Sequence, residues 1–175
     1  MASKTPKLPP ARFVRSVLKS FMQDSGLEPR LFGPHLRITN AQEGRVDFEL
    51  DIQPHHTILH GGTIASMVDL GGSLAVASNG LYATGVSTDL NVTYIGSGGK
   101  VGDKLRATAV LDKIGKTLAY TTVTFYNDKG EMTARGSHTK YVRAAWNPDL
   151  PLWHAPEGAP VAEEEPEGNG EAKSS

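Results

Sequence analysis

The residues best suited to chemistry in this chain stand at the start of one long, almost uncharged segment. His60-Gly61-Gly62 precedes a run of small and apolar residues that extends to Asn79 and reads as a helix. Two glycines at a helix start leave backbone N–H groups uncovered, and the positive end of the helix dipole favours a negative charge beside them. A substrate oxygen that gains charge during acyl transfer fits such a site. The alternative is that the glycines form only a tight turn into a core helix.

This segment contains a single acid, Asp69, nine residues after His60. An acid two turns beyond the glycines could act on the same substrate. The other residues are apolar on all sides, which is typical of a buried helix, and the 18 residues of 62–79 span about 27 Å. A buried carboxylate is costly unless it is hydrogen-bonded, so we expect Asp69 either to contact polar neighbours or to line a wet pocket.

Alternation of apolar and polar residues predicts six strands around this helix. The predicted strands are 36–40, 45–52, 84–95, 104–114, 117–127 and 132–142. The turns between the last three are rich in the residues that hairpins favour, so these strands are expected to form a meander. We therefore predict an α+β fold in which one curved antiparallel sheet wraps a long central helix.

Composition sets further limits. A chain of 175 residues is long enough for one domain with a sizeable core. It has no cysteine, which excludes disulfides and cysteine-ligated metals, and no apolar run long enough to span a bilayer. It has no ligand-spaced cluster such as His-Glu-x-x-His, and its basic residues are dispersed without an aromatic platform. We expect no metal, no other cofactor, no membrane span and no nucleic-acid partner.

The C-terminal segment, 144–175, differs from the rest in charge and in proline content. It contains seven acids and one lysine, a net charge of −6, which leaves +5 on the remainder of a chain whose total is −1. A positive body suits a polyanionic ligand, but it is equally compatible with an ordinary solvated surface. Five prolines and a glutamate-rich run predict a disordered acidic tail, whose only large apolar groups are Trp146, Leu152 and Trp153.

The N-terminal segment has two interpretations. Its basic residues precede the first acid, Asp24, as in a mitochondrial transit peptide. Apolar residues also recur at helical spacing and would equally pack a helix on the body: Phe13, Val17, Leu18 and Phe21. The expected organisation is a flexible 1–11, a domain over 12–143 and the tail 144–175. Localisation is predicted to be mitochondrial or cytoplasmic, with the mitochondrion slightly favoured.

Several motifs of the chain occur together in one known family. They are His60-Gly61-Gly62, Asp69, and the segments 85–94 (GVSTDLNVTY), 115–120 (GKTLAY) and 134–140 (ARGSHTK). In their order and spacing, from about Phe13 to Tyr141, the chain resembles the hotdog-fold acyl-CoA thioesterases of the acyl-CoA thioesterase 13 and phenylacetyl-CoA-pathway type. The resemblance implies a hotdog fold, hydrolysis of acyl-CoA to free acid and CoA, no cofactor beyond the CoA of the substrate, and a homodimer or a tetramer of paired dimers.

The resemblance also implies roles for individual residues. Gly61 would stabilise an oxyanion through its N–H, Asp69 would act as base or nucleophile, and Ser87 of a second subunit would position water. Further residues would bind the substrate: His55, His56, His60, Gly62, Tyr94, Ile95, Gly96, Ser97, Gly98, Gly99, Lys100, Lys113, Ile114, Gly115, Lys116, Thr117, Leu118 and Tyr141. The lysines among them would meet CoA phosphates, or are ordinary exposed charges at strand ends. Arg135, His138 and Lys140 are further candidates to assist.

One loop departs from the family pattern. The family has an asparagine six residues before the histidine and a glycine three before it, where this chain has Pro54 and Thr57. The asparagine helps to orient water or the thioester. His55, His56 or Thr57 could substitute for it, whereas His60 is expected to brace the turn. The alternative function is therefore a catalytically weakened acyl-CoA-binding protein on the same fold, and a third is an interaction protein that works through its acidic tail.

Overall fold

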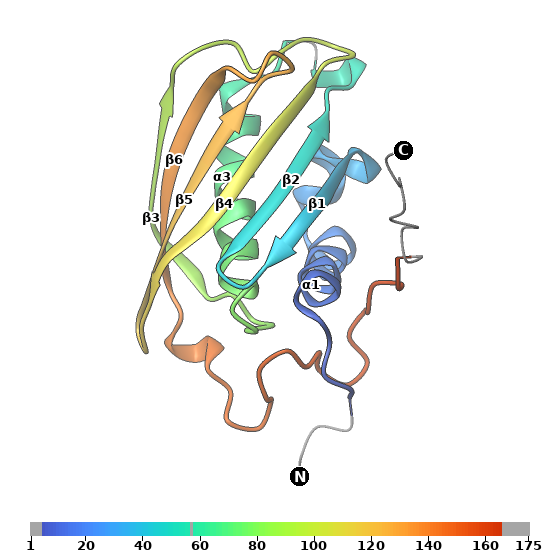
Figure 1. The fold of residues 1–175 in the computed structure, drawn as a ribbon, viewed down its shortest axis with the longest axis vertical. Helices are drawn as coiled ribbons and strands as arrows, with labels where there is room; N and C mark the ends of the chain where they lie inside the picture. The colour runs from blue at the N-terminus through green and yellow to red at the C-terminus, as the bar shows by residue number, and fades with distance from the viewer. Residues whose placement is uncertain (1–4, 57, 166–175) are drawn as a thin grey trace, which may run out of the picture.

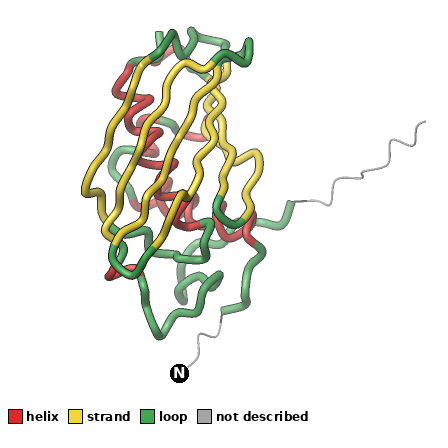
Figure 2. The backbone as a smooth tube through the Cα atoms, turned by 60° about the vertical axis from the view of Figure 1, so that its left-hand side comes forward, coloured by secondary structure: helices red, strands yellow, loops and turns green. Residues whose placement is uncertain are grey.

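The computed structural model describes residues 5–56 and 58–165, and it contains one curved antiparallel sheet around a central helix (Figure 1). The strands are β1 Leu36–Gln42, β2 Arg45–Asp51, β3 Val86–Tyr94, β4 Lys104–Ile114, β5 Leu118–Tyr126 and β6 Met132–Tyr141, in the order β1-β2-β4-β5-β6-β3. The helices are α1 Pro10–Asp24, α2 Glu28–Leu31 and α3 Gly61–Ala77, with 3-10 turns η1 Gly33–His35, η2 Pro54–His56 and η3 Arg143–Ala145. Turned by 60°, the sheet is seen to curve over α3 (Figure 2). This is the predicted hotdog fold, and β4, β5 and β6 form the expected meander.

Helix α3 forms the core of the molecule. It begins after His60, whose Nδ1 accepts a hydrogen bond from the Gly62 N–H at 2.8 Å. It ends at Ala77, and Gly80 then takes a φ of +90°, a left-handed conformation that glycine adopts without strain. Gly71 lets the sheet approach the helix, because a Cβ there would lie 2.9 Å from the Phe48 ring. Although α3 is apolar, neither it nor any other helix within 5–56 and 58–165 has the length and hydropathy needed to cross a membrane.

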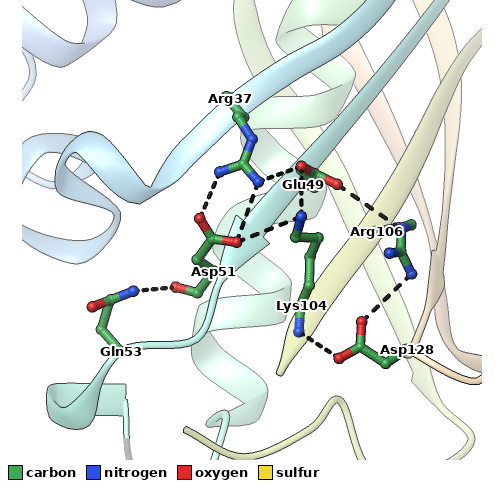
Figure 3. Close-up of polar contacts among 7 residues, drawn as sticks. All are labelled: Arg37, Glu49, Asp51, Gln53, Lys104, Arg106 and Asp128. Atoms are coloured by element: carbon green, nitrogen blue, oxygen red, sulfur yellow. Dashed lines mark hydrogen bonds and ion pairs between the residues drawn. The ribbon is translucent and has the colours of Figure 1, made fainter. Parts of the chain in front are cut away.

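The outer face of β1, β2 and β4 carries a network of paired charges (Figure 3). Arg37, Glu49 and Arg106 stand side by side on the three strands, and Lys104 Nζ lies 3.2 Å from Glu49 Oε1. A hydrogen bond from Arg37 lowers the pKa of Asp51. The charges on this face satisfy one another, which distinguishes it from the inner face, where the candidate site lies.

Strands β1 and β3 are the two edges of the sheet. Every residue of β3 is exposed except Val92, which is half-buried, and its exposed apolar side chains include Val86, Leu90 and Tyr94. A bulge interrupts the pairing of β3 with β6 between Ser87 and Asp89. An open edge strand with apolar side chains is a surface that folded proteins usually cover.

Helix α1 packs its apolar face on the body, as one of the two interpretations of the N-terminus predicts. Its buried residues are Phe13, Val14, Ser16, Val17 and Leu18. The chain before the helix is also held, because Leu8 is buried and its N–H donates to the Trp153 carbonyl at 2.9 Å. The expected flexibility of 1–11 is therefore wrong for 5–11, and 1–4 lie outside the described residues.

The C-terminal segment 144–165 packs on the body instead of forming a disordered tail, and its later part runs along α1 (Figure 1). The Trp153 ring meets the Phe13 ring edge-on, with 5.5 Å between their centroids. Two ion pairs join the segment to α1: Arg12 to Glu164 at 2.7 Å and Arg15 to Glu165 at 3.2 Å. The prediction of disorder is wrong for 144–165, because an aromatic anchor and charge pairing supply contacts that composition does not reveal. Residues 166–175 lie outside the described part of the chain.

Candidate active site

Three polar side chains converge at the middle of α3. Ser87 Oγ donates to Asp69 Oδ1 at 3.1 Å, His138 Nε2 lies 2.7 Å from Ser87 Oγ, and the same nitrogen lies 3.3 Å from Asp69 Oδ1. An imidazole protonated on Nε2 satisfies both contacts, because Nε2–H then donates to Ser87 while the serine hydroxyl donates to the carboxylate. Carboxylate, hydroxyl and imidazole thus form one hydrogen-bonded cluster.

The sheet register brings these groups together. Ser87 pairs with Lys140 across β3 and β6, and beyond the β3 bulge Leu90 pairs with His138. His138 reaches Asp69 only because Gly72 stands below it, since a Cβ at Gly72 would lie 2.3 Å from His138 Nδ1. An alanine at that position would push the imidazole away from Ser87. Gly72 is therefore part of the architecture that positions the cluster.

His138 is completely buried. Burial is the main cause that lowers its pKa, the positive charge of Lys140 lowers it further, and the negative charge of Asp69 opposes both. Its Nδ1 has no hydrogen-bond partner among the described residues. The ring is therefore held neutral near pH 7, with Nε2 as the nitrogen that meets the cluster.

Lys140 is a second buried titratable residue of β6. Its side chain is only 3% exposed, and Nζ donates to Ser73 Oγ at 2.9 Å. Burial lowers the pKa of the ammonium, and the charge of Asp69 counteracts this. His138 and Lys140 appeared in the sequence only as candidates to assist. Their alternation on the inward face of β6, together with Ala134 and Gly136, is the signal that points them at α3.

Asp69 opens onto a pocket of about 300 Å³. Its side chain is 50% exposed, so the expectation of a buried carboxylate is wrong, while the expected polar contacts and pocket are both present. The pocket is lined by Phe21, Glu28, Asp69, Leu70, Ser73, Thr84, Gly85, Val86, Ser87 and Lys140. The pocket therefore contains both a positive side chain, Lys140, and a negative one, Asp69. Within the part of the chain that the structure describes, no group of three or more His, Asp or Glu side chains is arranged to hold a metal ion.

The glycine pair lies at the other end of α3. The His60 side chain takes the Gly62 N–H, and the His60 carbonyl accepts from Thr63 and Ile64. The Gly61 N–H has no acceptor among the described residues, so it is the donor that the helix start leaves free. His60 therefore braces the turn, as expected.

Gly61 and Asp69 are too far apart to act on one carbonyl within a single chain. They are separated by eight residues of α3, or about 12 Å along the helix axis. Ser87, by contrast, contacts Asp69 of its own chain. We expected Gly61 and Asp69 of one chain to share a substrate and Ser87 to come from a second subunit. The geometry instead places Ser87 beside Asp69 and leaves Gly61 out of reach.

The two segments predicted to bind CoA also lie at opposite ends of the sheet. The loop 95–100 adjoins the Gly61 end, where Leu59 N–H donates to the Gly99 carbonyl and Gly98 packs on Leu59. Residues 113–118 and Tyr141 lie at the far end of β4 and β6. The 11 residues of β4 separate the two ends by about 35 Å. One chain cannot present both segments to the same CoA molecule near its thioester.

In the loop that departs from the family, one of the two histidines is already hydrogen-bonded. His56 is buried, its Nδ1 accepts from the Gln53 N–H, and its Nε2 lies 2.9 Å from the Leu31 carbonyl. It links the loop to α2 rather than facing a substrate. His55 is exposed, with its ring tilted by 51° against the His56 ring, and Pro54 is exposed in η2. Thr57 lies outside the described residues.

Relatives of known family identify the chain. A family model described as thioesterase superfamily matches residues 56–134. A candidate esterase of Schizosaccharomyces pombe is 42% identical over 137 residues, which cover 76% of this chain and 84% of that protein. Human acyl-coenzyme A thioesterase 13 is 36% identical over 134 residues, 74% of this chain and 94% of that protein. The chain belongs to the thioesterase superfamily.

A solved structure agrees with this assignment. Zebrafish thioesterase superfamily member 2 matches with a TM-score of 0.68 and 32% identity, covering 77% of this chain and 98% of that one. The resemblance seen in the sequence motifs is thereby confirmed, and this thioesterase superfamily member is a thioester hydrolase.

Proposed function

We propose that this thioesterase hydrolyses acyl-CoA to free acid and CoA. The observation that carries the proposal is the cluster of Asp69, Ser87 and His138 at the mouth of a pocket. Relatives that bear the name acyl-coenzyme A thioesterase support CoA as the carrier of the thioester. The pocket beside Asp69 then receives the acyl group at the carbonyl end.

Asp69 acts as base or nucleophile in this proposal. As a base, the carboxylate takes a proton from a water that Ser87 helps to position, the water oxygen bonds to the carbonyl carbon, and the C–S bond breaks as CoA leaves. As a nucleophile, the carboxylate itself attacks the carbonyl carbon, the C–S bond breaks as CoA leaves as a thiolate, and water then hydrolyses the resulting anhydride to the free acid and the restored carboxylate. In both routes negative charge develops on the carbonyl oxygen, which requires a donor on its other side.

A second copy of the chain supplies that donor. The free N–H of Gly61 lies about 12 Å from Asp69 in its own chain, so the Gly61 that serves Asp69 comes from the partner subunit. An antiparallel pairing of two chains at the open β3 edge sets the Gly61 end of one subunit against the Ser87 end of the other. It also covers the exposed Leu90 and Tyr94. We therefore propose a homodimer at least.

Subunit complementation tests both the chemistry and the assembly. Asp69→Asn and Gly61→Pro proteins, each inactive alone on a panel of acyl-CoA thioesters, are mixed after subunit exchange. A heterodimer contains one site with both residues intact, so a random 1:1 mixture recovers about a quarter of the parent activity. No recovery despite mixed dimers, or a fully active monomer by sedimentation, overturns the composite site. A parent enzyme inactive on every acyl-CoA overturns the proposed reaction.

One observation favours the alternative, an acyl-CoA-binding protein with weakened turnover. Pro54 has no amide side chain, and His56 is already engaged with Gln53 and Leu31. In that case CoA thioesters bind tightly with little release of CoA. Pro54→Asn then raises turnover, by about 10-fold or more if it restores one hydrogen bond in a dry site. His55→Ala tests whether the exposed His55 replaces the family asparagine. Loss of activity in that variant shows that it does.

A further inference from the structure

A groove lies between α1, the α2–η1 segment and the start of β1. It has a volume of about 520 Å³. Met22 and Pro29 line this groove, whereas the residues before them in the chain, Phe21 and Glu28, line the pocket beside Asp69. Helices α1 and α2 therefore separate the two cavities, and the groove is not part of the candidate active site.

The floor of the groove is apolar. The apolar residues that line it are Leu18, Met22, Pro29, Pro34, Leu36 and Ile38. Three of them, Leu18, Leu36 and Ile38, are buried members of the main hydrophobic core, so the groove reaches down to that core. A hydrocarbon chain placed there would remove apolar surface of both partners from water. The floor therefore suits a ligand with an aliphatic tail.

The rim of the groove is cationic. Arg15 and Lys19 lie one turn apart on α1, and Arg37 faces them from β1. Arg37 is engaged by acids on the outer face of the sheet. The two cations of α1 are held by the C-terminal segment instead: Arg15 pairs with Glu165 at 3.2 Å, and Lys19 Nζ donates to the Val161 carbonyl at 3.3 Å.

The Glu165 carboxylate shows which chemical group this rim accepts. Glu165 is the one acid that lines the groove, and it belongs to a segment that follows Tyr141, where the family resemblance ends. Its side chain is 69% exposed. An ion pair so exposed to water and salt is weak, so another carboxylate can replace that of Glu165 at Arg15.

We propose that this groove binds a free fatty acid, whose carboxylate displaces Glu165 from Arg15 and whose tail lies on the apolar floor. The Arg15 guanidinium can donate two parallel N–H groups to a carboxylate, and Lys19 adds a second positive charge beside it. A neutral lipid lacks the head group for this rim, and an inorganic anion lacks the tail for this floor. The site is separate from Asp69, and the proposal does not depend on the proposed hydrolysis.

Calorimetric titration of the full chain with decanoate and with 1-decanol tests the site, because these ligands share one tail and differ in the head group. The parent should bind decanoate more tightly than decanol. Arg15→Gln and Lys19→Gln should each weaken decanoate binding by about 5-fold or more and leave decanol binding unchanged. Glu165→Gln frees Arg15 and should strengthen decanoate binding by about 3-fold. Lys129→Gln removes an exposed cation from the β5–β6 turn and is the matched control.

Several outcomes overturn the proposal. A parent protein that binds no decanoate contradicts it, and so does equal decanoate affinity in the parent, Arg15→Gln and Lys19→Gln. Equal affinity of the parent for decanoate and decanol means that the rim recognises no carboxylate. Unchanged decanoate affinity in Glu165→Gln means that Glu165 does not compete for Arg15. All these titrations measure binding without turnover, so their failure is distinct from a failure to hydrolyse acyl-CoA.

Discussion

The Tyr94 hydroxyl donates to the Gly61 carbonyl at 2.8 Å, and the Tyr94 ring lies 3.2 Å from the point where a Gly61 Cβ would stand. A side chain at the end of the exposed edge strand β3 therefore holds the first residue of α3 in place. The contact anchors the residue that carries the free N–H. It also explains why this end of β3 and the glycine pair belong to one half of the proposed composite site.

The Gly61 N–H can be removed with little change to the backbone. Proline is favoured at the first position of a helix, and His60 has the extended conformation (φ −68°, ψ 142°) that a residue before proline requires. Gly61→Pro should lower kcat by about 100-fold, because one oxyanion donor is lost. Gly61→Ala adds a Cβ at the same crowded point beside Tyr94 but keeps the N–H, so it is the matched control. If both variants lose the same activity, crowding and not the N–H is responsible.

Asp69→Asn keeps the shape of the side chain and removes its charge. We expect turnover to fall by at least about 100-fold, since amide nitrogen and oxygen can serve neither as base nor as nucleophile. The free energy of unfolding should change little, because the carboxylate is half-exposed and its removal relieves no large burial cost. Glu43→Gln removes an equal charge from an exposed turn residue and should have parent kinetics. A folded Asp69→Asn protein with parent turnover contradicts the catalytic role.

The glycine pair and Asp69 were found in the sequence because they stand in one helix, where spacing along the chain becomes spacing in space. Ser87 and His138 belong to strands that are paired across a bulge, and their meeting at Asp69 depends on a register that no local pattern specifies. The bounds of α3 and of the six strands lie within two residues of those predicted, since each depends on local periodicity and turn residues. The prediction that Ser87 comes from a second subunit was wrong, because Ser87 contacts Asp69 of its own chain. With Ser87 placed there, the residue about 12 Å from Asp69, Gly61, is the one that must come from the partner subunit.

The buried His138 should make stability depend on pH. Its pKa is lowered in the folded protein, whereas an imidazole in the unfolded chain titrates near about 6.5. As the pH falls below about 6.5 the unfolded chain takes up a proton that the folded protein refuses. The free energy of unfolding therefore falls by up to about 1.4 kcal/mol per pH unit until the folded pKa is reached.

Urea unfolding of parent and His138→Gln proteins between pH 8 and pH 5 measures this effect. The variant should lose the slope in that window, and His55→Gln, at an exposed position, should keep the parent slope. Loss of stability from the paired carboxylate of Asp51 falls in a lower window, because its pKa is lowered from 3.8. Identical slopes for parent and His138→Gln mean that the ring is protonated as easily in the folded protein as in the unfolded chain.

The C-terminal segment should stabilise the fold without taking part in the reaction. A chain that ends after Asn147 keeps Trp146 but loses Trp153, Ala155 and the glutamates that pair with Arg12 and Arg15. Without Trp153 the buried Leu8 and Phe13 are uncovered, so we expect the free energy of unfolding to fall by about 3 kcal/mol, with kcat retained at low temperature. A chain that ends after Glu165 retains all these contacts and is the control.

Two outcomes contradict this prediction. If the shorter chain unfolds like the control, the contact of Trp153 with α1 adds no stability. If it folds stably but loses kcat, the segment shapes the site through α1 and Phe21, which lines the pocket beside Asp69.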